Sequence, residues 1–212
     1  MRRESHVRFR EGAGVKLPRA TRLVVGFQHR TDAERFLGEF RERLATFGLE
    51  LSAEKTRLIQ FGRFAALNRR ERGQGKPETF TFLGFTHYCG TRRSDGSFIV
   101  WRKTAKTRMA AKLWALKAEL RRRMHEPLSR VGEWVRKVLT GYYQYHAIPG
   151  NLDRLSVFRH RLRRLWRTVL RRRSQRGWMN WLRLSRKLDR WTPSPRVLHP
   201  YPAQRFAASH PR

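Results

Sequence analysis

Residues 131–176 read VGEWVRKVLTGYYQYHAIPGNLDRLSVFRHRLRRLWRTVLRRRSQR and contain two amphipathic helical patterns. Apolar side chains recur at steps of three and four, which is the spacing of a stripe on one face of a helix. The first stripe comprises Val131, Trp134, Val135, Val138, Leu139, Tyr142 and Tyr145, and the second comprises Leu155, Phe158, Leu162, Leu165, Trp166, Val169 and Leu170. Pro149, Gly150 and Asn151 separate them. The pattern predicts two paired helices joined by a hinge, with both stripes buried.

The second predicted helix carries basic side chains opposite its apolar stripe. A turn of about 100° per residue places four of them there, with three arginines flanking. The four are His160, Arg164, Arg167 and Arg171, and the flanking residues are Arg163, Arg172 and Arg173. Asp153 is the one acid between Pro149 and Arg176, and charges of one sign oppose folding unless a polyanion meets them. This set of basic side chains therefore favours nucleic-acid binding over the alternative that the arginines merely keep the surface of a helical bundle solvated.

The composition agrees with an anionic partner. Among 212 residues, 49 Lys and Arg stand against 16 Asp and Glu, giving a formal net charge of +33, which predicts a phosphate-rich partner. Nucleic acid is favoured over a membrane, because the most apolar run, residues 23–27, is far too short to span a bilayer. The basic N-terminus lacks the apolar core of a secretory signal, so a cytoplasmic location is expected.

The residues that bind metals elsewhere are scattered. Cys89 is the single cysteine, so neither an intrachain disulfide nor a cysteine-rich zinc site is expected. The eight histidines form no His-Glu-x-x-His pattern. No metal site is therefore predicted from the residues present.

The chain before residue 104 predicts a small α+β piece. Residues 1–22 lack a sustained apolar period and are expected to be a disordered leader. Strands are expected at residues 23–28, 57–61, 80–88 and 97–102, the last two forming a hairpin across Ser94-Asp95-Gly96, with an exposed loop at residues 73–77. A capping box, Thr31-Asp32-Ala33-Glu34, begins a helix that stops at Gly48. Its expected buried face is Ala33, Phe36, Leu37, Phe40, Leu44 and Phe47.

The remaining segments predict more helices. One helix is predicted to begin near Thr104 and to end at Pro127. Its apolar side is formed by Met109, Leu113, Leu116, Leu120 and Met124. Residues 178–188 predict a short helix, and Pro193 and Pro195 begin an extended tail. The expected fold class is α+β, with an α+β piece to about Lys103 followed by a basic helical piece.

Several strings, taken in order, resemble one family. They are Val24-Val25-Gly26-Phe27, Gly48-Leu49-Glu50-Leu51, Glu54-Lys55-Thr56, Phe82-Leu83-Gly84-Phe85, Gly141-Tyr142-Tyr143-Gln144-Tyr145 and Leu198-His199-Pro200-Tyr201-Pro202. The chain looks like the C-terminal part of a bacterial group II intron reverse transcriptase and maturase. The resemblance implies that residues 23–103 are a palm remnant, residues 104–176 the helical thumb (maturase X region) and residues 177–212 a basic DNA- and RNA-binding tail. Residues 1–22 would be a non-homologous leader.

The resemblance also implies that the catalytic centre is missing. In active relatives a Tyr-Ala-Asp-Asp string supplies aspartates that hold Mg²⁺, whereas Arg19, Ala20, Thr21 and Arg22 stand at that position here. The fingers and most of the palm would lie upstream of Met1. We therefore expect no catalytic residue and no cofactor in this chain, and we interpret residues 1–22 as the product of a frameshift, which the upstream genomic sequence would test.

Two further sites follow from the resemblance. Lys55 inherits a position near the polymerase site, and Phe82, Leu83, Gly84 and Phe85 inherit the turn that supports the primer strand. The structural alternative is that Phe82 and Phe85 pack, Gly84 permits close backbone approach and Lys55 is solvated. Aromatic side chains near the hinge and in the tail could stack on bases or belong to the core. They are Tyr142, Tyr143, Tyr145, His146, Trp178, Trp181 and Trp191, of which Tyr142 and Tyr145 are expected in the core.

Three functions fit these patterns. The favoured one is a maturase thumb fragment that binds structured group II intron RNA, and also target DNA, without polymerase activity of its own. A second is an RNA-directed DNA polymerase that works only when a complementing chain supplies fingers and palm. A third is a basic structural RNA-binding protein, which would explain the charge and leave the ordered strings unexplained.

Overall fold

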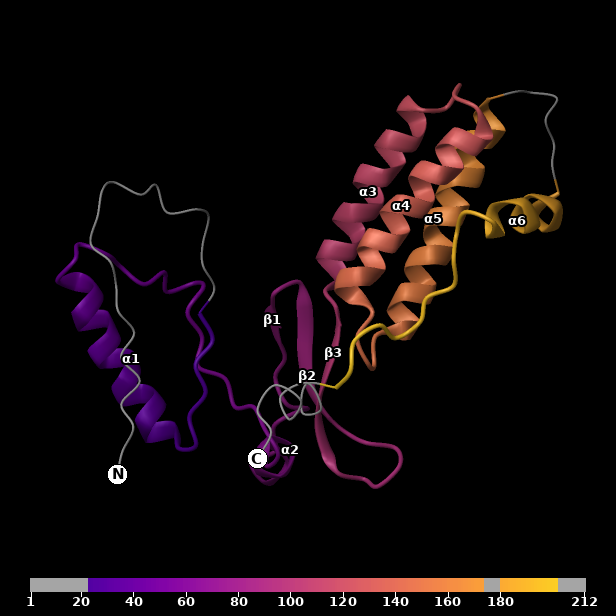
Figure 1. The fold of residues 1–212 in the computed structure, drawn as a ribbon. Helices are drawn as coiled ribbons and strands as arrows, with labels where there is room; N and C mark the ends of the chain where they lie inside the picture. The colour runs from indigo at the N-terminus through magenta and orange to yellow at the C-terminus, as the bar shows by residue number, and fades with distance from the viewer. Residues whose placement is uncertain (1–22, 174–179, 202–212) are drawn as a thin grey trace, which may run out of the picture. The chain divides into compact units, whose positions relative to one another are not determined.

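The computed structural model describes residues 23–173 and 180–201, and this part of the chain is α+β (Figure 1), as predicted. It contains six helices and one three-stranded antiparallel sheet. The chain forms two compact units, Met1–Thr56 and Arg57–Arg212. Residues 1–22, including the predicted leader, lie outside the described residues, as do Trp178 and the tail beyond Tyr201.

The first unit is built on helix α1 (Arg30–Ala45). The predicted helix is confirmed, but His29 takes the N-cap position without a side-chain bond, and Arg30 pairs with Glu34 at 2.7 Å. Gly48 ends the helix with φ of 67°, as expected for a left-handed stop. The expected burial is wrong at one end, because Ala33 is buried whereas Phe47 is 69% exposed.

Two predicted strands are absent. Residues 23–28 and 57–61 adopt neither strand nor helix, and Leu23 is 65% exposed where burial was expected. A strand requires a neighbour for its backbone hydrogen bonds, and in the described part of the chain every strand lies between residues 80 and 104. The apolar composition of the two segments was therefore a misleading signal.

The second unit contains a sheet of three strands, β1 (Phe80–Phe82), β2 (Phe85–Thr91) and β3 (Phe98–Thr104), in the order β1-β2-β3. A single strand over residues 80–88 was predicted, and this is wrong because Leu83 and Gly84 form a two-residue turn with φ of 46° and 80°. Positive φ at both positions matches the twist of a tight hairpin. The return strand is confirmed, with β2 and β3 joined across residues 92–97.

The sheet is preceded in the chain by a short helix and followed by the long helices. The short helix α2 (Ala65–Glu71), which the sequence did not predict, precedes the irregular stretch expected at residues 73–77. The sheet also continues directly into the helices, because Thr104 ends β3 and is 3% exposed. The predicted domain boundary after residue 103 thus falls inside the second compact unit.

Three long helices, α3 (Lys106–Arg122), α4 (Leu128–His146) and α5 (Leu152–Arg172), form a bundle (Figure 1). The predicted stripes form its core, as expected from their helical period. Its members buried most completely include Met109, Leu120, Val135, Leu139, Leu155, Phe158, Leu162 and Trp166. The short helix α6 (Trp181–Asp189) adds Leu184 and Leu188 to this core. The sequence predicted a helix over residues 178–188, and α6 confirms it from Trp181 onward.

The hinge between α4 and α5 falls at Pro149, Gly150 and Asn151, as the sequence predicted. Gly150 has φ of 80°, and the Trp101 ring from β3 lies against it, so that an added Cβ would come within 2.4 Å of the ring. Asn151 is fully buried. Its side chain accepts a hydrogen bond from the Thr104 amide and donates to the His146 carbonyl, both at 2.8 Å. These bonds tie the end of the sheet to the hinge.

The segment after α6 packs back on the bundle. Trp191 lies over Gly132, where an added Cβ would come within 2.3 Å of the indole, and its ring centre is 6.1 Å from that of Trp166. The Tyr143 hydroxyl donates to the Pro193 carbonyl at 3.1 Å. Of the two readings of Trp191, base stacking or anchoring, the packing supports anchoring.

Two histidines of the second unit have lowered pKa values. Burial lowers the pKa of His87 below its ordinary value of 6.5, with Arg102 lowering it further, and burial also lowers the pKa of His146. A lowered pKa means that the neutral ring is favoured in the folded chain, so its stabilising contribution is complete above pH 6.5 and is lost as the pH falls below that value.

We expect the free energy of unfolding to decrease as the pH falls from about 7.5 to 5, across the ordinary histidine pKa. Denaturant titrations at several pH values measure this, and the double variant His87→Gln, His146→Gln should show a flatter profile. Glu119 does not interfere, because hydrogen bonds from Arg122 and Arg123 lower its pKa to about 2. An equally steep profile in the double variant would refute the assignment.

Candidate nucleic-acid interface

The outer side of α5 carries exposed arginines, which we call the α5 ridge. It consists of Arg161, Arg164, Arg171 and Arg172, all exposed. The opposite side of the same helix enters the core through Leu155, Phe158 and Leu162, each fully buried. The apolar stripe therefore fixes the direction in which the arginines point. Arg161 was not among the predicted site residues, although the same helical period places it beside Arg164.

Arg163 does not belong to this surface, which corrects its prediction as a nucleic-acid-binding residue. It is 7% exposed. Its guanidinium donates to Asp189 Oδ1 at 2.7 Å and to the carbonyl and hydroxyl oxygens of Ser185 at 2.7 and 2.6 Å. Arg159 also binds Asp189, at 2.8 Å. These bonds link α5 to α6. They also supply the pairing that the buried Arg163 cation requires.

Arg167 and Arg173, two further predicted contacts, are partly engaged within the protein. Arg167 is half-buried, and its guanidinium lies 5.1 Å from the ring centre of Trp181. Arg173 is exposed, but it donates to the Glu126 carbonyl at 3.1 Å and thereby binds the connection between α3 and α4. Trp181, for which stacking and anchoring were both considered, thus contacts an arginine of the neighbouring helix.

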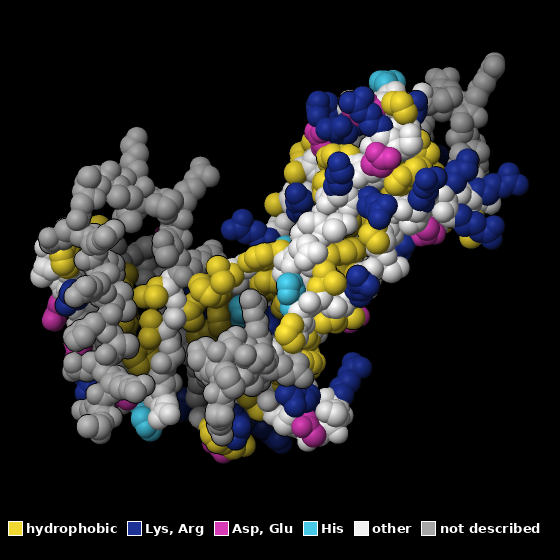
Figure 2. All heavy atoms as spheres, in the orientation of Figure 1, with side chains coloured by type: hydrophobic (Ala, Val, Ile, Leu, Met, Phe, Trp, Pro, Cys, Tyr) yellow, Lys and Arg dark blue, Asp and Glu magenta, His cyan; other side chains and the backbone are white. Residues whose placement is uncertain are grey.

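Charge balance separates the α5 ridge from the rest of the helix. In residues 23–173 and 180–201, the ion pairs made by α5 are those of Arg159 and Arg163 with Asp189. Arg161, Arg164 and Arg172 have no acidic partner within this described part. Figure 2 shows Lys and Arg side chains along the visible face of the bundle, with few acidic side chains between them. Arg161, Arg164 and Arg172 are thus a fixed row of cations whose charge no described acidic side chain compensates.

The turn at Phe82, Leu83, Gly84 and Phe85 has a defined structure. Phe85 is 8% exposed and packs against Tyr145 with 5.6 Å between ring centres, whereas Leu83 is 66% exposed at the tip. The Tyr145 hydroxyl donates to the Leu83 carbonyl at 2.7 Å, and Gly84 lies close to the Tyr145 ring. Phe82 is half-buried. Lys55, the other residue to which the resemblance assigned a role, is exposed in a turn of the first unit.

The aromatic residues near the hinge divide between core and surface. Tyr142 and Tyr143 are 9% and 5% exposed, and burial raises the pKa of each to about 12. Tyr142 in the core was predicted, and stacking of Tyr143 on bases is not compatible with its burial. Tyr145 was expected in the core but is 52% exposed. The sequence missed Trp114 on α3, which is 75% exposed and lies off the apolar stripe.

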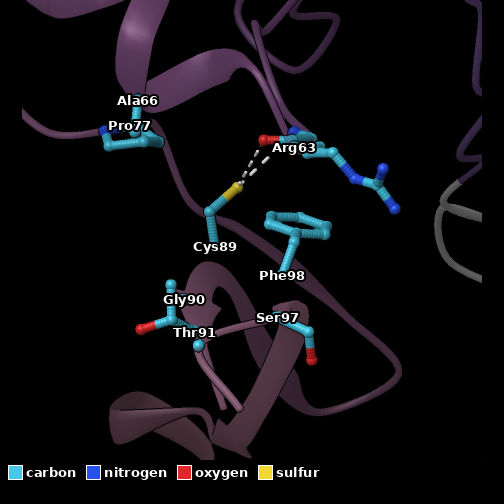
Figure 3. Close-up of a pocket in the computed structure, with 10 residues that line it drawn as sticks. Arg63, Ala66, Pro77, Cys89, Gly90, Thr91, Ser97 and Phe98 are labelled. Carbon is cyan, nitrogen blue, oxygen red and sulfur yellow. Dashed lines mark hydrogen bonds between the residues drawn. The ribbon is translucent and has the colours of Figure 1, made fainter. Parts of the chain in front are cut away.

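A shallow pocket of about 560 Å³ lies between α2 and the sheet (Figure 3). Cys89 contributes its sulfur, which accepts a hydrogen bond from the Gly62 amide at 3.4 Å and lies 3.6 Å from the Gly62 carbonyl oxygen. Arg63 is the other ionisable residue of the lining. Figure 3 shows the Cys89 sulfur pointing toward the segment that contains Arg63, with the Phe98 ring beside it. The lining offers no base beside the thiol, so we assign no chemistry to this pocket.

The described residues form neither a metal-binding cluster nor a membrane-spanning helix. No group of three His, Cys, Asp or Glu side chains there could hold a metal ion. None of the described helices combines the length and apolar character that a bilayer-spanning helix needs. Arg19, Ala20, Thr21 and Arg22, which the resemblance aligns with a catalytic motif, lie outside the described residues.

Comparison with known proteins adds no assignment to this geometry. Searches of family models, curated proteins and solved structures found no significant match to the chain.

Proposed function

We propose that this chain is an RNA-binding protein whose helical bundle holds structured RNA through the α5 ridge. The observation that carries the proposal is the difference between two sets of arginines on one helix. Arg163 is buried and bound to Asp189, whereas Arg161, Arg164 and Arg172 are exposed and have no acidic partner in the described part of the chain. The packed core holds the second set in a fixed row.

Phosphate oxygens are the ligands that such a row suits best. A guanidinium is planar, stays charged at all accessible pH values and can donate two parallel hydrogen bonds to a phosphate. Neutralising phosphates releases counterions, which makes association favourable at moderate salt. The three arginines span about 16 Å along the helix axis, at a rise of about 1.5 Å per residue. That length suits contacts with successive phosphates of a folded RNA.

We further propose that the RNA is a group II intron and that the chain acts as a maturase thumb fragment. The support is the resemblance of the ordered strings, together with an antiparallel hairpin that leads directly into three packed helices. This order is what the resemblance implies for the end of a palm and the start of a thumb. Target DNA and a complementing polymerase chain are candidate additional partners of the same fragment.

The purified chain is expected to extend no primer on any template with Mg²⁺ or Mn²⁺. The physical reason is that Thr21 and Arg22 stand where metal-binding aspartates are needed, and an arginine cannot coordinate a cation. A radiolabelled primer-extension assay measures this, with an intact reverse transcriptase as the positive control. Detectable cDNA synthesis by the chain alone would contradict the assignment of a fragment without catalysis.

The RNA-binding proposal is tested by binding measured across salt. If about five to eight phosphates are contacted, affinity for a structured intron-like RNA should fall by two or more decades between about 50 and 200 mM salt. Fluorescence anisotropy with labelled RNA gives the slope, and a duplex DNA of equal charge tests preference for RNA. Absence of binding at the lowest salt, or a slope near zero, would refute the proposal.

A further inference from the structure

Trp114 on α3 is the most exposed large apolar side chain in the described part of the chain, at 75%. The buried stripe of this helix is formed by Met109, Leu113, Leu116 and Leu120. At about 100° per residue, Trp114 lies about 130° from the centre of that stripe. It therefore points away from the core that α3 shares with α5.

Trp114 differs from the other described tryptophans in having no aromatic or cationic partner among residues 23–173 and 180–201. Trp101 lies against Gly150, Trp134 under Arg123 and Trp181 under Arg167, while Trp166 and Trp191 contact each other. No ring or cation–π contact of Trp114 occurs among the described residues. Its neighbours one turn away on the same face include Ala110 and Ala118, both exposed, and such small side chains leave the faces of the indole uncovered.

The charges around this indole are positive. Lys117 and Arg121 lie one and two turns further along the same face, and neither forms an ion pair in the described part of the chain. Glu119 is the one acid of α3, and it is bonded to Arg122 and Arg123, each at 2.6 Å. A bare aromatic ring bordered by cations is the arrangement that binds single-stranded nucleic acid, because bases stack on the ring and phosphates meet the cations. A protein-binding patch would instead gather further large apolar side chains around the indole.

We propose that Trp114 stacks on an unpaired base of the bound RNA while Lys117 and Arg121 contact the adjoining phosphates. This inference rests on the proposed function and deepens it, because it specifies that the RNA presents a single-stranded nucleotide to α3. Stacking on an aromatic side chain changes affinity by roughly 5- to 150-fold per base. The contact is sequence-tolerant, because every base has a π face.

The test compares two RNAs with the full-length chain. One is a structured hairpin with a single-stranded extension, and the other is the same hairpin with a blunt end. Trp114→Ala should weaken binding of the extended RNA by roughly 5- to 150-fold and leave the blunt RNA within about twofold. The salt slope should stay the same, because stacking releases no counterions. Trp114→Phe should keep most of the affinity.

A matched control is Leu67→Ala, which removes another exposed apolar side chain, 55% exposed on α2, and should change neither affinity. Unchanged thermal unfolding of Trp114→Ala establishes that the fold is intact. No loss with Trp114→Ala, or an equal loss for both RNAs, would overturn the inference and leave the α5 ridge in place. Failure of the unmodified chain to bind either RNA would overturn the proposed function and this inference together.

Discussion

Replacing Arg161, Arg164 and Arg172 together by glutamine is expected to weaken binding of structured RNA by roughly one to two decades near 0.1 M salt. Each arginine that neutralises one phosphate contributes about 0.9 to the salt slope, so the slope should flatten by up to about three. Glutamine keeps a long polar side chain on the helix surface, so the fold should be preserved. Anisotropy titrations across salt measure both quantities.

The control for this variant is Arg41→Gln, Arg43→Gln, Arg70→Gln. These arginines are also exposed and helical, and their replacement removes the same formal charge. If the α5 ridge is the contact surface, the control should lose much less affinity and should retain the slope of the unmodified chain. Equal losses in the two triple variants would show that the charge acts as a diffuse cloud with no site on α5.

Replacing Asp189 by alanine is expected to destabilise the folded chain by about 2–3 kcal/mol. Removing one partner of a fully buried ion pair costs about 3–5 kcal/mol, because the other charge is left unpaired. Here the cost is smaller, since the Asp189 side chain is 49% exposed and water replaces part of the lost contact. For a chain of this length the melting temperature should fall by roughly 5–10 °C. Thermal unfolding followed by circular dichroism measures it.

Two variants isolate the reason for that loss. Asp153→Ala removes an exposed acid from the first turn of α5 and should cost well under half as much, although the change in net charge is the same. Adding Arg163→Met to Asp189→Ala removes the unpaired buried cation and should recover part of the stability. Equal destabilisation by Asp153→Ala and Asp189→Ala, without recovery in the double variant, would show that net charge is responsible and the buried pair is not.

The helical half of the fold could be predicted because its signal is local. The stripes that contain Leu120, Leu139 and Leu162 recur at the helical period, and all three residues are fully buried. The hinge at Pro149, Gly150 and Asn151 was also predicted, and the structure adds that Gly150 has a positive φ, which glycine adopts readily.

The strands could not be predicted equally well, because a strand depends on a partner elsewhere in the chain. Residues 23–28 have strand-like composition, yet no neighbouring strand exists in the described part of their unit. The break at Leu83 was hidden for a different reason. A leucine with φ of 46° is uncommon, and the hydrogen bond from Tyr145, 62 residues away, helps hold it.

The candidate site was partly predictable. Helical rotation placed Arg164 and Arg171 outside correctly, and both are exposed. It also placed Arg163 on the flank of the exposed row, because the pattern of one helix carries no information about a second helix packed against it. The acidic partner of the buried Arg163 guanidinium is Asp189 on α6, 26 residues later. Trp114 was missed, although the helical period places it about 130° from the centre of the stripe formed by Met109, Leu113, Leu116 and Leu120.

The most direct test of the central claim is to map the RNA contact on the full-length protein by ultraviolet cross-linking and mass spectrometry of the linked peptides. If the α5 ridge holds structured RNA, cross-linked peptides should concentrate in residues 160–173, and the Arg161, Arg164 and Arg172 triple variant should lose them. Cross-links confined to the first unit, or spread evenly over the basic residues of the chain, would contradict the claim.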